Sequence, residues 1–133
     1  MSAAVAAARE QTVRIARLND LARSAMGVAC TAVTTVGFRS LPDADQSRVR
    51  EMIETYDAFD EDNDPHGKRD FGTIYQLCDG SWTTERPRLS DDERERVFWK
   101  FDYYDCDLQF GSEDAANPAI TRRVLTIMLA DEY

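Results

Sequence analysis

The first half of the chain changes twice between helical and extended hydrophobic patterns. Residues 3–25 carry apolar side chains at spacings of three and four with arginines between them, which predicts a helix that ends near Gly27. The residues that set this spacing are Ile15, Leu18, Ala22 and Ala25. Residues 28–38 are rich in Val and Thr and have no helical period, so we expect a strand. A second helix is predicted behind Pro42. Its apolar stripe is Val49, Met52, Ile53, Tyr56 and Phe59.

The second half begins with two segments of alternating pattern. The segment 70–78 predicts a strand, and 97–105 predicts a second one next to it and antiparallel to it. The residues that share a face are Phe71, Thr73, Tyr75 and Leu77 in the first strand, and Val97, Trp99, Phe101 and Tyr103 in the second. The connection 79–96 is too long for a tight hairpin, so we expect a projecting arm. Ser90 and Glu93 form a capping-box pattern, which predicts a short helical turn within it.

The last segment is predicted to be a helix. Asn117 and Pro118 are typical of a helix start, and four apolar residues after them are expected to face inward. These residues are Ile120, Val124, Leu125 and Met128. The predicted fold is therefore one compact α+β domain over residues 1–133, with about three antiparallel-type strands packed on three helices in the order α-β-α-β-β-α.

Composition narrows the class of protein. The chain has 133 residues, 43% of them hydrophobic, and no apolar run near the roughly 20 residues that span a bilayer. We therefore expect a cytoplasmic protein without a membrane segment. Three cysteines without metal-ligand spacing disfavour a disulfide framework or a zinc site. The net charge of −9 disfavours direct binding of nucleic acid and favours a partner protein with a basic surface.

The stretch FDEDNDPHGKRDFG, residues 59–72, is the best candidate for chemistry. An EF-hand loop that starts at Asp60 would need Gly at position 6 and Glu at position 12, but Pro65 and Phe71 stand there. The lone His66 has no nucleophile motif near it. We therefore predict no catalytic residue, metal or cofactor, and interpret the stretch as a turn, with Gly67 available for positive φ.

Acids and aromatic residues remain as candidates for binding a partner. One group is the acidic rim of this turn, and a second lies at the end of the predicted strand 97–105. Trp82, in the connecting arm, either packs on the core or anchors a partner. The predicted partner-binding residues are Asp60, Glu61, Asp62, Asp64, Trp82, Asp102, Tyr104, Asp105 and Asp107.

Three blocks, DNDPHGKRDFG, FWKFDYYDCDLQFGS and NPAITRRVLTIMLADEY, occur in this order within residues 14–133. Together they resemble an uncharacterised family of small bacterial proteins, known only as a domain of unknown function and often found on plasmids and other mobile elements. In that family an acid and a histidine commonly precede the DFG block. This chain has Lys68 and Arg69 there, and two adjacent positive charges disfavour a cation site.

Size, acidity and the resemblance together suggest a non-enzymatic binding protein. The more specific hypothesis is an inhibitor of a host defence complex, of anti-CRISPR or anti-restriction type, that mimics nucleic acid and occupies a basic surface. Two alternatives stay open. One is a metal-dependent enzyme such as a nuclease that uses the acidic loop 60–70, and the other is an accessory protein of another partner. Nothing in the sequence indicates the oligomeric state.

Overall fold

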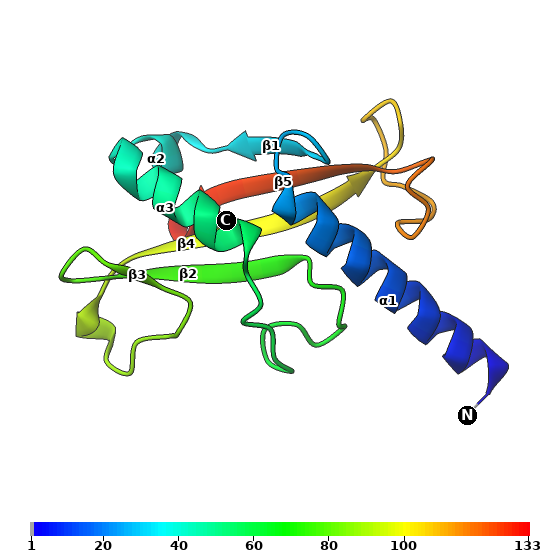
Figure 1. The fold of residues 1–133 in the computed structure, drawn as a ribbon, viewed down its shortest axis with the longest axis horizontal. Coiled ribbons are helices and arrows are strands. Elements are labelled where there is room, and N and C mark those ends of the chain that lie inside the picture. The colour runs from blue at the N-terminus through cyan, green and yellow to red at the C-terminus, as the bar shows by residue number, and fades with distance from the viewer. Residues whose placement is uncertain (1) are drawn as a thin grey trace.

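The computed structural model describes residues 2–133 and contains one five-stranded sheet in the order β1-β5-β4-β2-β3 (Figure 1). The strands are β1 Thr31–Thr34, β2 Phe71–Leu77, β3 Trp82–Thr83, β4 Glu93–Tyr104 and β5 Arg122–Leu129. β1 runs parallel to β5, and the other neighbours are antiparallel. The α+β class is confirmed, but the predicted number of strands was too low.

The helices are α1 Ala3–Ser24, α2 Val36–Arg39 and α3 Asp43–Glu54. They lie on one side of the sheet, and the first turns of α1 extend beyond its edge (Figure 1). The core forms between them and the inward side chains of the central strands. Its fully buried members include Phe38, Val49, Ile53, Ile74, Val97, Trp99, Leu125 and Ile127.

The two predicted helices of the first half are present. The first ends at Ser24, and Gly27 follows with φ 82°. The helix behind Pro42 spans Asp43–Glu54 and buries the first part of the predicted stripe, while the chain leaves the helix before Tyr56 and Phe59. The predicted strand 28–38 is only partly correct. It pairs over Thr31–Thr34, and then the side chain of Thr35 caps the short helix α2 by accepting a hydrogen bond from the Phe38 N–H.

The two predicted strands of the second half are confirmed as the antiparallel pair β2 and β4. In β2, however, the buried face is Gly72, Ile74 and Gln76, opposite to the four residues chosen from the pattern. Within the connection 79–96, β3 turns back to pair with β2. The short helical turn is confirmed as a 3-10 helix at Ser90–Asp92.

The predicted closing helix is wrong, because residues 122–129 form strand β5. β5 pairs with β4 on one side and with β1 on the other. Its buried residues Arg123, Leu125 and Ile127 alternate as in a strand, and Met128 is buried as well. Only a short 3-10 helix, η2 Ala130–Glu132, follows. Within residues 2–133, no helix combines the length and apolarity needed to cross a membrane.

Candidate interaction surface

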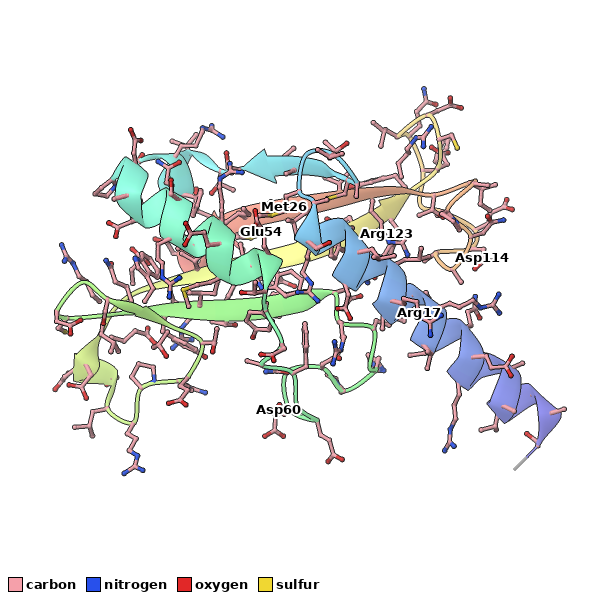
Figure 2. All side chains as sticks on the ribbon, viewed as in Figure 1. Arg17, Met26, Glu54, Asp60, Asp114 and Arg123 are labelled. Atoms are coloured by element: carbon pink, nitrogen blue, oxygen red, sulfur yellow. The ribbon has the colours of Figure 1, made fainter. Side chains whose placement is uncertain are left out.

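The acids are concentrated on α3 and on the loop that joins it to β2. Residues 43–64 contain nine acids and two arginines. Val49, Met52 and Ile53 bury one side of α3, so the acids of the helix lie on its other sides and at its ends. Glu54 stands at the end of α3, and Asp60 lies on the loop that follows (Figure 2). The exposed acids of this segment are Asp43, Glu51, Glu54, Asp57, Asp60, Glu61 and Asp62.

Hydrogen bonds inside the loop fix its first turn. Asp60 Oδ1 accepts from the N–H groups of Asp62 and Asn63, each at 2.9 Å. Asn63 Oδ1 accepts from the Asp60 N–H at 2.9 Å, and its Nδ2 donates to the Ala58 carbonyl at 2.8 Å. Such side-chain caps give hydrogen-bond partners to backbone groups of a turn that pairs with no strand or helix. Glu61 and Asp62 are exposed at the tip of this turn, and none of their side-chain atoms takes part in it.

The second turn of the loop depends on another acid. The carboxylate of Asp64 accepts from the Arg69 N–H at 3.2 and 3.3 Å, and Arg69 has φ 56°. Gly67 has φ 72°, as its predicted role in the turn requires. The acidic rim is therefore not uniform. Asp60 and Asp64 stabilise the loop, whereas Glu61 and Asp62 face solvent.

Arginines and an aromatic ring attach the loop to α1. The guanidinium carbons of Arg23 and Arg69 lie 5.3 and 4.9 Å from the ring centre of Phe59. Asp20 on α1 pairs with both arginines, at 2.9 Å from Arg69. Arg23 is 2% exposed and donates to the Tyr56 carbonyl at 2.8 Å, and burial lowers the pKa of its guanidinium. These contacts give the acidic loop a rigid base.

A groove of about 620 Å³ runs between this loop and residues 84–86. Asp60 and Asp62 stand on one wall, and Glu85 with Arg86 stands on the other. Tyr56, Phe59 and Tyr75 contribute aromatic surface. We call this hollow the acidic groove. The other residues that line it are Ala58, Asn63, Thr73 and Thr84.

The second predicted group lies apart from this groove. Asp102 pairs with Lys100 at 2.8 Å, and this hydrogen bond raises the pKa of the lysine. Asp105 Oδ1 accepts from the Asp107 and Gln109 N–H groups, so this carboxylate caps a turn of its own. The segment that follows β4 contains Asp114, and in Figure 2 Asp114 and Asp60 lie on opposite sides of α1. Tyr104 is half-buried in β4.

Trp82, which was expected either to pack on the core or to anchor a partner, packs on the core. It is 9% exposed, and its indole Nε1 donates to Asp45 of α3 at 3.0 Å. Among residues 2–133, no three His, Cys, Asp or Glu side chains are grouped so that they could hold a metal ion.

A family described as "Protein of unknown function (DUF3768)" matches residues 34–132. The chain belongs to this family. The resemblance to an uncharacterised family is thereby confirmed. No curated protein and no solved structure matches the chain. The DUF3768 match includes α3, the acidic loop and the whole groove, while α1 precedes it.

Sequence analysis did not identify every residue of the acidic groove and its surroundings. The acids of α3 could have been found, because a charge count over 43–64 shows their excess. Glu85 and Tyr75 could not, because they reach the groove through the β2–β3 turn, which the sequence did not predict. The roles of Asp20 and Phe59 depend on contacts between distant segments, for which no local pattern exists.

Proposed function

We propose that this protein is a non-enzymatic binding protein whose acidic groove takes a basic segment of a partner protein. One observation carries the proposal. Asp60 and Asp62 from one loop and Glu85 from another stand around a hollow with aromatic walls. Carboxylates recognise lysine and arginine by charge-assisted hydrogen bonds, and aromatic rings accept the same cations over their faces. The exposed acids of α3 extend the attraction beyond the groove.

Side chains rather than backbone pairing should dominate recognition. The groove passes the edge of β2, where β3 pairs only with Tyr75 and Gln76. The Thr73 N–H on this edge already donates to the Tyr56 hydroxyl at 3.4 Å. A partner strand would have to displace this hydroxyl, so the edge is protected against strand addition.

The test uses a labelled hexa-arginine peptide and a charge-matched pair of variants. Asp62→Asn with Glu85→Gln removes two charges from the groove. Within residues 2–133, these two residues form hydrogen bonds through their backbone N–H groups and not through their side chains, so the fold should be kept. Glu113→Gln with Asp131→Asn removes two exposed charges elsewhere and is the control. Exposed ion pairs contribute about 0.2–1 kcal/mol each, so the groove variant should bind about fivefold more weakly. Equal weakening in both variants would show that only net charge matters and would refute a defined groove.

The more specific proposal is that the partner is a nucleic-acid-binding protein of a host defence complex and that this chain inhibits it. Its support is the net charge of −9 and the resemblance to a family found on mobile elements. A pull-down from a bacterial lysate, washed with rising salt, would identify the partner. The bound partner should lose its affinity for nucleic acid when this protein is added, and about fivefold more of the groove variant should be needed for the same loss. A partner that binds this protein and nucleic acid together would contradict inhibition by mimicry.

A further inference from the structure

A second cavity, of about 630 Å³, lies away from the acidic groove and is lined by arginines instead of acids. It is bounded by the C-terminal half of α1, by residues 27–32 and by the start of β5. Leu18, Leu21 and Val28 contribute apolar walls, and Thr121, Arg122 and Arg123 form a polar end. Figure 2 shows Arg123 next to α1, at the end of the sheet away from α3.

Arg123 is a buried cation without an acidic partner. It is 8% exposed, and its Nε donates to Asn19 Oδ1 at 2.8 Å. One terminal nitrogen donates to the Ala115 carbonyl at 2.5 Å, and the guanidinium carbon lies 5.2 Å from the ring centre of Tyr103. All three partners are neutral. Arg23, the other deeply buried arginine, is paired with Asp20, whereas no acid among residues 2–133 forms an ion pair with Arg123.

Such an arrangement costs free energy unless an anion offsets it. A buried charge loses hydration, and neutral hydrogen-bond acceptors replace only part of that loss. The second terminal nitrogen of Arg123 has no hydrogen-bond partner among the described residues, and it is not one of the sealed atoms that lack one. It is therefore available for a further hydrogen bond, and Arg123 is one of the residues that line the cavity. Arg122, which is exposed, also lines the cavity, but it precedes Arg123 in β5 and its side chain alternates with that of Arg123.

The walls distinguish between kinds of anion. The cavity has the size of small-molecule sites, and its aliphatic side chains favour a ligand with an apolar body. The C-terminal end of α1 adjoins it, and the partial negative charge of a helix C-terminus disfavours a dianion more than a monoanion. We propose that this cavity binds an organic monocarboxylate with a short apolar body, whose carboxylate is held by Arg123. This site is separate from the acidic groove, and neither proposal depends on the other.

Cys30 provides a local probe, because it lines this cavity while Cys78 and Cys106 are exposed elsewhere. The experiment measures the rate at which iodoacetamide alkylates each cysteine, by peptide mass spectrometry of the intact folded chain at one pH. Octanoate is the probe ligand, octanol supplies the apolar body without the charge, and inorganic phosphate supplies an anion without the apolar body. Saturating octanoate should slow alkylation of Cys30 about tenfold and leave Cys78 and Cys106 unchanged.

The controls decide each part of the proposal. Octanol and phosphate should protect Cys30 less than twofold, and equal protection by either would overturn the choice of a monocarboxylate. Arg123→Gln should abolish protection by octanoate. If that variant does not fold, Ala29→Trp is used instead, and it should also abolish protection. Ala29 is exposed and lines the cavity, so a large ring at this position would fill it. Unchanged alkylation of Cys30 in the wild type, or full protection in either folded variant, would refute the site.

Discussion

Gly72 should be the glycine of this fold that is least able to accept a side chain. A Cβ atom built on it would lie 2.3 Å from Trp99 Nε1 and 2.5 Å from Cε2 of the same ring. Both distances are far below van der Waals contact, so Gly72→Ala requires the indole ring or the strand to move. Gly72 and Trp99 are directly opposite each other in the β2–β4 pair. The clash therefore lies in the middle of the sheet.

The magnitude follows from how firmly Trp99 is held. The ring is 0% exposed and makes edge contacts with Tyr56 at 5.2 Å and Phe101 at 6.1 Å between ring centres. The guanidinium of Arg23 lies over it at 5.1 Å. Overpacking of a dense core costs about 1–3 kcal/mol, and losing a buried Trp side chain costs about 3–5 kcal/mol. Since the ring can shift but not leave, we expect Gly72→Ala to lower the free energy of unfolding by about 2–4 kcal/mol.

Urea denaturation followed by tryptophan fluorescence measures this loss. Gly111→Ala is the matched control, since its nearest new contact would be at 3.9 Å, and it should change stability by less than about 0.5 kcal/mol. In a double-mutant cycle, Trp99→Phe removes the ring atoms that clash, so the double variant should be more stable than the sum of the single effects by about 1 kcal/mol or more. A Gly72→Ala variant within about 0.5 kcal/mol of the wild type, or strictly additive effects, would refute the reasoning.

Two further predictions concern a buried amide and a carboxylate near the C-terminus. Asn19→Ala removes an amide that is 0% exposed and bonded to three groups, so urea denaturation should show a loss of about 2–4 kcal/mol, while exposed Gln11→Ala should show almost none. The Thr35 hydroxyl lowers the pKa of Glu132 below its ordinary 4.5, so this carboxylate stabilises the fold above that pH and the effect is lost as the pH falls through the lowered pKa. Glu132→Gln should therefore lower the thermal midpoint at pH 7 and lower it less at acid pH; an equal or larger effect in acid would contradict this.

The helices α1 and α3 and the strands β2 and β4 could be predicted, because helical spacing persisted over several turns or alternation persisted over most of a strand. The C-terminal segment could not, because Ile120, Val124 and Met128 fit a helical spacing while Leu125 and Ile127 fit a strand. Strand pairing decides in favour of the strand, since β5 lies between β1 and β4 in the sheet and pairs with both. Asn117 and Pro118 form a turn all the same, in which Asn117 Oδ1 accepts from the Ala119 N–H.

The candidate site was predicted in part for a similar reason. The loop acids could be found because turn chemistry and charge are local properties of the sequence. Sequence could not show that Asp60 and Asp64 accept backbone hydrogen bonds while Asp62 does not, since this depends on the turn geometry. It could not show that none of the second acidic group lines the acidic groove, because that separation arises from tertiary packing.

The net charge of the chain does not describe the charge at each of its surfaces. The value of −9 predicted a partner with a basic surface and disfavoured direct binding of nucleic acid. The charges are unevenly placed, however, with nine acids and two arginines in residues 43–64 and four arginines and two acids in residues 1–33. At protein distances a ligand experiences the nearest groups most strongly, because ions screen charges beyond about 8–10 Å. A basic partner at the acidic groove and a carboxylate beside Arg123 are therefore compatible within one chain, since each would meet a local charge opposite to its own.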